Sequence, residues 1–454
     1  MIASYKGHFQ FIVAMAIMYI CGVWFDPLVY ILFPIALFLF GMKKYFFELL
    51  ILTIWILMLA DYVPVKNATH DDLQWAKDLK FLAPLSLVLV FMINYDDFRP
   101  VPRMFLAFIP FLITAVFALN YSIDFSVGLQ KTISFILIYF SIPVFVIYLH
   151  RNHGEQFWTA LLTFIIGMLT IGIVLRFLAP QIALIEGTSR FKGVLGNPNG
   201  LGIFLNLTFI LWITLRELKL INLSKRESWY VLLIILISVI WSGSRNGMMS
   251  IFLFFLLSRL IKINWFLAII AVTVVIGFQD QLFEVFIGII EFFQLQQFFR
   301  VESLEEGSGR TIAWAFAWQE IQNYFFVGGG FGHDEHIMRP NYYWMAKLGH
   351  QGGVHNSYLS MWFDAGIVGL VLYMMALVSL VFKAMKKNYL VLAFAISVLF
   401  NITYESWLVA SLNPFTVIFL IILTIFTSGI TGQETAPVAE EVSPVQSTPQ
   451  PVLA

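Results

Sequence analysis

Residues 229–261 read WYVLLIILISVIWSGSRNGMMSIFLFFLLSRLI, two apolar runs joined by a short hairpin that carries Arg245. Each run has nearly the length that a helix needs to cross a bilayer within a bundle. The same composition extends over the whole chain, since 60% of the 454 residues are apolar and only 12% are charged, against roughly 25% charged residues in soluble domains. The sequence therefore predicts an integral membrane protein.

Fourteen apolar runs along the chain are candidates for membrane-spanning helices. They lie near residues 8–25, 27–42, 45–60, 81–94, 104–119, 132–149, 157–178, 198–215, 229–242, 246–261, 263–278, 356–383, 388–403 and 412–429. The predicted fold is an all-α polytopic membrane protein with about 12–14 transmembrane helices, which form one membrane domain over residues 1–430.

The lysines and arginines of the short loops indicate the orientation, because they are enriched on the cytoplasmic side of membranes. With a cytoplasmic N-terminus, fifteen of them fall inside and seven fall outside. We therefore expect both termini in the cytoplasm and one large loop, about 279–355, on the outer face. An interfacial helix is expected over Gln281–Arg300. The tail 431–454, rich in Pro, Glu and Ser, is expected to be disordered.

Charge and cysteine content exclude several function classes. The 27 Lys and Arg residues balance 27 Asp and Glu residues, so no positive field recruits nucleic acid. The single cysteine, Cys21, can build neither a disulfide framework nor a cysteine metal site. A transporter or flippase usually needs polar or charged groups near the middle of its spans, and the predicted spans are nearly free of them. Arg176, near the end of its span, is the closest to an exception. A transporter of lipid-linked glycans is therefore a distant alternative.

Two groups of polar residues on the predicted outer face favour anion binding. Arg190 precedes Asn197-Pro-Asn199-Gly, a turn signal before an apolar run, and the N–H groups of a helix that starts there suit an anion. A plain capped loop explains this pattern equally well. Arg245, in the outer hairpin, opposes the usual inside preference of arginine, so we expect an outer ligand to hold it. Its alternative is snorkelling to lipid headgroups.

Two further groups belong to the large loop. Gly307-Ser-Gly-Arg310 precedes the glycine-rich segment 327–332, which fits either a phosphate cradle or a flexible turn. His355-Asn356 follows, where the chain returns to the membrane, and His355 is a candidate general base at neutral pH or a surface residue. His333-Asp-Glu-His336 is a weak metal pattern, because no third ligand is fixed. We therefore expect no metal site.

Taken together, these elements resemble the O-antigen ligase and polymerase superfamily. They are Arg190 with G-N-P-N-G-L-G, S-R-N-G around Arg245, Arg310 before G-G-G-F-G, and H-N-x9-G-x-x-G from His355 to Gly369. The last element is similar to one shared by lipopolysaccharide O-antigen ligases and protein O-oligosaccharyltransferases. The resemblance covers roughly residues 185–375.

The resemblance implies a metal-independent, inverting membrane glycosyltransferase of the GT-C type, without cofactor, in the bacterial inner membrane. Its donor is a glycan on undecaprenyl diphosphate at the periplasmic face. Arg245, Arg310 and Arg190 are then expected to bind the diphosphate, since fixed guanidiniums stabilise a leaving group that gathers negative charge. His355 is expected to position or deprotonate the acceptor hydroxyl, with Asn356, Asn197 and Asn199 in supporting positions.

The acceptor distinguishes the functions that share this chemistry. An O-antigen ligase transfers the finished glycan to lipid A-core, whereas a polymerase of O-antigen, capsule or exopolysaccharide joins repeat units on the carrier. A protein O-oligosaccharyltransferase modifies a protein. We expect a ligase, with membrane lipids as the surroundings of the chain, and keep the other two as alternatives.

Overall fold

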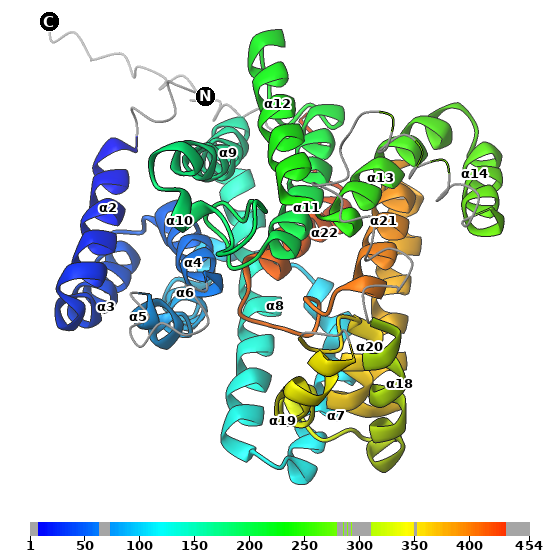
Figure 1. Cartoon of the computed structure of the whole chain (residues 1–454). Helices are drawn as coiled ribbons and strands as arrows, with labels where there is room; N and C mark the ends of the chain where they lie inside the picture. Colours follow the sequence, from blue (N-terminus) through cyan, green and yellow to red (C-terminus); the bar gives the residue numbers. More distant parts are fainter. Residues whose placement is uncertain are drawn as a thin grey trace, which may run out of the picture.

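The structure is a computed structural model that describes residues 8–62, 73–278, 310–348 and 352–432, together with Val285, Gly288 and Phe292. Every predicted apolar run is helical in it (Figure 1). The corresponding elements are α2 (Phe9–Trp24), α3 (Asp26–Met42), α4 (Phe46–Asp61), α6 (Leu82–Ile93), η2, α7 and η3 (together Met104–Tyr121), α8 (Phe125–His153), α9 (Glu155–Leu178), α11 (Pro198–Glu217), α12 (Lys225–Ser242), α13 (Arg245–Ile263), α14 (Trp265–Gly277), α20 (Ser357–Met385), α21 (Leu390–Tyr404) and α22 (Pro414–Ser428). The all-α fold is therefore confirmed.

Six of these fourteen segments are long and apolar enough to cross a membrane by themselves, and the other eight are shorter or begin with several charged residues. The chain is thus a polytopic membrane protein, while the count of 12–14 crossings stays a prediction. The expected interfacial helix Gln281–Arg300, apart from three of its residues, and the tail from residue 433 lie outside the described residues, as do Gly307, Ser308 and His350.

Short elements connect the long helices. They are η1 (Tyr95–Phe98), α5 (Gln74–Leu79), α10 (Pro180–Ala183), and, in the large loop, α18 (Arg310–Ile321), η5 (Gln322–Tyr324) and α19 (His333–Lys347). In Figure 1 α18 and α19 pack beside α20, below the region where α11 and α13 begin. Within the described residues the chain forms no strand beyond one isolated bridge between Leu184 and Phe191.

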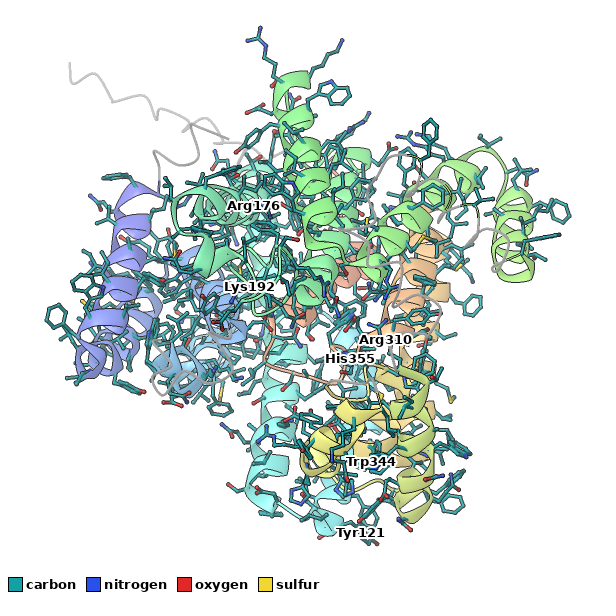
Figure 2. The ribbon with its side chains drawn as sticks, in the orientation of Figure 1. Tyr121, Arg176, Lys192, Arg310, Trp344 and His355 are labelled. Carbon is teal, nitrogen blue, oxygen red and sulfur yellow. The ribbon has the colours of Figure 1, made fainter. Side chains whose placement is uncertain are left out.

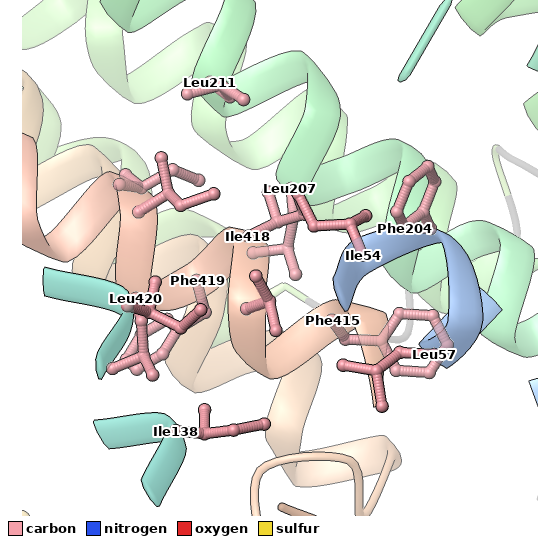
Figure 3. Packing of buried hydrophobic residues seen from close by; sticks show 14 of the residues in the cluster. Ile54, Leu57, Ile138, Phe204, Leu207, Leu211, Phe415, Ile418, Phe419 and Leu420 are labelled. Carbon is pink, nitrogen blue, oxygen red and sulfur yellow. The ribbon is translucent and has the colours of Figure 1, made fainter. Parts of the chain in front are cut away.

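The centre of the bundle is formed by α4, α11 and α22, whose residues are buried nearly all round. Figure 3 shows Ile54 of α4, Phe204 and Leu207 of α11, and Ile418 of α22 packed together. Outer helices instead expose large apolar side chains, for example Phe38, which is 66% exposed. Apolar helices buried at the centre and apolar faces turned outward are the arrangement that a lipid solvent permits.

Small residues allow α11 and α13 to pack closely, and polar residues join α13 to α21 by hydrogen bonds. A Cβ on Gly247 of α13 would come within 2.6 Å of the Cα of Gly202 on α11, so only glycine permits this close crossing. The Asn401 amide of α21 donates to Ser250 Oγ at 3.0 Å, and the Asn246 amide of α13 donates to the Asn401 carbonyl at 3.0 Å. These bonds fix the end of α21, after which the chain continues into Glu405.

Candidate active site

A buried carboxylate joins two of the predicted site residues. Glu405, directly after α21, accepts a hydrogen bond from Arg310 Nη2 at Oε1, 2.8 Å away, and its Oε2 lies 3.3 Å from His355 Nδ1. The Glu405 side chain is 7% exposed and that of Arg310 is 18% exposed. Figure 2 shows Arg310 and His355 next to each other, between the bundle and the helices of the large loop. The loop, α20 and α21 therefore meet in an Arg–Glu–His cluster.

The pairing with Glu405 determines how the imidazole of His355 is presented. A carboxylate only accepts hydrogen bonds, so Nδ1 is the donor in this contact and Nε2 is the ring nitrogen that Glu405 does not engage. The backbone of His355 has φ 48°, a left-handed conformation that is uncommon outside glycine. A Cβ at Gly352 would lie 2.8 Å from Nε2. Glycine at position 352 thus avoids a close contact between a side chain at that position and the imidazole of His355.

The segments on both sides of His355 are held by hydrogen bonds. Asn356 Oδ1 accepts the backbone N–H groups of Tyr358 and Leu359 and thereby caps α20. Trp314 Nε1–H donates to the Val354 carbonyl at 3.0 Å, which ties α18 to the segment before the histidine. Asn356 therefore acts here as a helix cap, which supports the position of His355 through the backbone.

A second group of predicted residues gathers where α11, α12 and α13 end or begin. Arg190 donates from Nε to the Ser242 carbonyl at 3.1 Å and from Nη2 to Asn199 Oδ1 at 3.1 Å. Asn197 caps α11 by accepting the N–H of Gly200 at 2.7 Å, as the turn signal predicts. Arg245 is the first residue of α13, three positions after Ser242, and is half-buried. Arg190 and Arg245 thus belong to one corner of the bundle.

The glycine-rich segment 327–332 docks onto a break in α20. The N–H of Gly329 donates to the Phe363 carbonyl and that of Gly330 to the Asp364 carbonyl, each at 2.9 Å. The Asp364 carboxylate accepts the N–H groups of Gly332 at 3.0 Å and Asp334 at 3.1 Å. These N–H groups are used within the protein, so the phosphate-cradle interpretation of the segment is wrong. The acidic residue Asp364 inside an apolar helix has the same explanation, because its side chain holds the loop.

Gly366 makes the break possible. Its φ of 67° and ψ of 177° lie in a region that only glycine populates freely, and a Cβ there would overlap the Phe326 carbonyl. The next two residues of α20, Ile367 and Val368, donate their N–H groups to the carbonyls of Phe325 and Phe326. The first glycine of the H-N-x9-G-x-x-G element is therefore a docking point between loop and membrane helix.

Gly366→Ala is expected to undock the loop, because the added methyl group clashes with backbone and the strained conformation costs about 1–3 kcal/mol. Limited proteolysis of the purified protein should then cut α18 or α19 at least several times faster than in the wild type. Gly277→Ala is the control, since nothing lies within 4 Å of a Cβ at that position. Unchanged cleavage of the Gly366 variant would contradict the docking role.

His333, the first residue of α19, is buried. Neither ring nitrogen has a hydrogen-bond partner among the described residues, and the ring packs edge-on against Tyr324 with the centroids 4.2 Å apart. Burial, and secondarily the neighbouring His336, lowers the pKa of His333 to about 4. Among the residues that the structure describes, no three His, Cys, Asp or Glu side chains are grouped to hold a metal ion.

Glu405, the residue that joins Arg310 to His355, is not among the site residues predicted from the sequence. One signal was present in the chain: Glu405 is the only charged residue between Lys387 and Glu434. A carboxylate within an otherwise uncharged apolar stretch indicates a fixed partner, because an unpaired charge there is costly. The position of Glu405 in the sequence therefore indicates that a partner exists but does not identify that partner.

The fold and the cluster define a polytopic helical membrane protein with an arginine, a glutamate and a histidine assembled at one end of its bundle. Residues 230–374, from α12 to the middle of α20, match the family model described as O-antigen ligase. This segment contains Arg245, Arg310 and His355 but not Arg190 or Glu405. The match confirms the resemblance to the O-antigen ligase superfamily. No curated protein matches the chain.

Proposed function

We propose that the protein is an O-antigen ligase that transfers a glycan from undecaprenyl diphosphate to a hydroxyl of lipid A-core at the periplasmic face of the inner membrane. The match to a family of membrane glycosyltransferases supports the reaction type. The observation that carries the proposal is the Glu405 carboxylate placed between His355 and Arg310. This arrangement puts a base, its orienting carboxylate and a cation within one buried cluster.

The proposed reaction is a single displacement. His355 Nε2 takes the proton of the acceptor hydroxyl while the hydroxyl oxygen attacks the anomeric carbon. The bond from that carbon to the diphosphate oxygen breaks, its electron pair leaves with the diphosphate, and the configuration inverts. Glu405 stabilises the imidazolium that forms, in the way that a buried carboxylate orients a catalytic histidine. No metal or other cofactor takes part in the proposed reaction.

The arginines neutralise the charge that collects on the diphosphate. Arg310 uses one donor on Glu405, and a guanidinium has four others. Arg190 and Arg245 supply further positive charge from the neighbouring corner of the bundle. Because guanidiniums form parallel hydrogen bonds with phosphate oxygens, they fix the leaving group as well as attract it.

A gene deletion followed by analysis of lipid-linked and envelope glycans tests this proposal. Loss of a ligase leaves long polymer on the undecaprenyl carrier and bare lipid A-core. Cores capped with a single repeat would instead identify a polymerase, and loss of sugar from envelope glycoproteins would identify a protein O-oligosaccharyltransferase. A transporter of lipid-linked glycans is kept as the distant alternative.

Activity is expected to be independent of divalent metal, because the arginines take the part that Mg²⁺ or Mn²⁺ plays in other sugar transferases. Purified enzyme treated with EDTA and then dialysed should transfer glycan at the rate of the untreated enzyme. If EDTA abolishes transfer and a divalent cation restores it, the segment His333–His336 has to be reconsidered as a ligand source.

The large loop is expected on the periplasmic side. The side chain of Tyr343 is 75% exposed. The cysteine introduced by Tyr343→Cys should react with a membrane-impermeant thiol reagent in cells with a permeabilised outer membrane. The experiment uses a Cys21→Ser background, since Cys21 is the only native thiol. Labelling that occurs only after lysis would reverse the orientation and with it the proposed mechanism.

A further inference from the structure

A long apolar groove lies between α2, α4 and α9, outside the Arg–Glu–His cluster. Its volume is about 660 Å³. Each helix contributes one stripe of side chains: Phe11 to Val23 on α2, Phe47 to Leu59 on α4, and Ala160 to Leu175 on α9. Tyr19 and Ile20 of the lining are 37% and 53% exposed, so the groove opens sideways to the bilayer.

The length of the groove exceeds one leaflet. At 1.5 Å per residue, the stripes on α2 and α4 run about 18 Å and the stripe on α9 about 22 Å. One leaflet accounts for about half of the roughly 30 Å hydrocarbon core. An acyl chain of a bilayer phospholipid ends near the midplane, so the groove suits a longer apolar chain.

A lysine and a carboxylate lie next to the outer mouth of the groove. Tyr62 lines the mouth, and Lys192 Nζ lies 4.0 Å from the centroid of its ring. The Lys192 side chain is buried, and nearby Asp61 accepts the N–H of Gly196 at 3.0 Å. Lys192 is two residues from Arg190, which reaches Ser242 beside the hairpin of Arg245. The mouth therefore connects to the predicted diphosphate-binding arginines through one loop.

We propose that the α2–α4–α9 groove holds the isoprenoid chain of the donor, with the diphosphate at its outer mouth between Lys192 and the arginines. This proposal rests on the proposed function. A second apolar groove, on α20 between Tyr358 and Val378, is nearer to His355 but has a volume of only about 300 Å³. The larger volume, and Lys192 packed against Tyr62 of the lining, favour the α2–α4–α9 groove.

Chain-length dependence tests the proposal. Donors with the same glycan diphosphate on a 55-carbon or a 10-carbon isoprenoid are compared for the wild type and for Ala16→Trp, which fills the groove from α2. The expected result is about a fivefold higher KM for the long donor and an unchanged KM for the short one. The expected change in KM is moderate because the isoprenoid enters the groove from lipid and not from water. The substitution therefore removes packing contacts between the isoprenoid and the groove but no hydrophobic driving force. Ile17→Trp, at the next residue, which is 51% exposed and outside the lining, should behave as the wild type.

Equal KM values for the long donor in Ala16→Trp and wild type, or an equal loss with both donors, would overturn the proposal. A donor with a photoreactive group near the end of its long chain gives a second readout. Crosslinks to α2, α4 or α9 are expected, whereas crosslinks to α20 would place the chain in the other groove and overturn the proposal. If the wild type transfers glycan from neither donor, the proposed function itself fails, independently of the groove.

Discussion

Glu405→Gln is expected to lower the kcat of glycan transfer by roughly 10²- to 10³-fold, the contribution typical of a general base that has lost its correct orientation and charge partner. The neutral amide keeps the shape of the side chain but no longer stabilises the imidazolium of His355. The KM for the donor should not rise, because Arg310 is released from its carboxylate partner and stays cationic. Steady-state kinetics with the purified variant measure both quantities.

The matched control is Glu335→Gln, which breaks the ion pair between Lys131 and Glu335. That pair has the same 2.8 Å length as the pair of Arg310 with Glu405, but it joins α8 to α19 away from His355. Transfer by the control should stay within about twofold of the wild type, as expected for a partly exposed pair. A Glu405→Gln protein of normal abundance and normal kcat would mean that the carboxylate has no part in the reaction.

Arg245→Lys is expected to impair transfer nearly as much as Arg245→Ala, by about 100-fold. Lysine keeps the charge but not the planar fork that binds two phosphate oxygens in parallel. A charge-assisted contact that strengthens as the leaving group develops charge contributes about 3 kcal/mol, which corresponds to that factor. Single-turnover transfer from a defined lipid-linked donor gives the rate, and immunoblotting of membranes gives the abundance, which should be near normal.

Arg259→Lys provides the comparison on the same helix. Arg259 lies toward the opposite end of α13, where its guanidinium is 5.4 Å from the ring centroid of Phe255. Its replacement should leave transfer unchanged. Full transfer by Arg245→Lys would mean that Arg245 serves only to anchor the hairpin at lipid headgroups, and the donor would then have to be held by Arg190 and Arg310.

Much of the fold could be predicted from the sequence, because a membrane-spanning helix is recognised from the composition of its own residues. All fourteen apolar runs are helices, and the helix start after Asn197 follows from its turn residues. Which helices occupy the centre could not be predicted in the same way. In lipid both buried and outward faces are apolar, so the sequence of α4 carries no stripe that distinguishes it from α2.

The site, too, could be predicted only where it depends on short sequence patterns, and not where it depends on contacts between residues far apart in the sequence. Arg310, His355 and their motifs are visible as short patterns, but Glu405 stands 50 residues after His355 in a segment without a recognised pattern. The role of the glycine-rich segment was equally hidden, because its partners on α20 are more than 30 residues away. Contacts of this kind depend on how the helices pack, which a single sequence does not state.

The break at Gly366 also defines how related enzymes can be recombined. Gly329, Gly330 and Gly332 donate hydrogen bonds to Phe363 and Asp364, and Ile367 and Val368 donate to Phe325 and Phe326. The segment 325–332 and the first half of α20 therefore form one exchangeable unit. A chimera that takes the large loop from one enzyme and α20 from another divides this unit and should not assemble. A cassette that starts before Arg310 and extends past Gly369 keeps it whole, so the loop can be exchanged with the seam placed inside the second half of the helix.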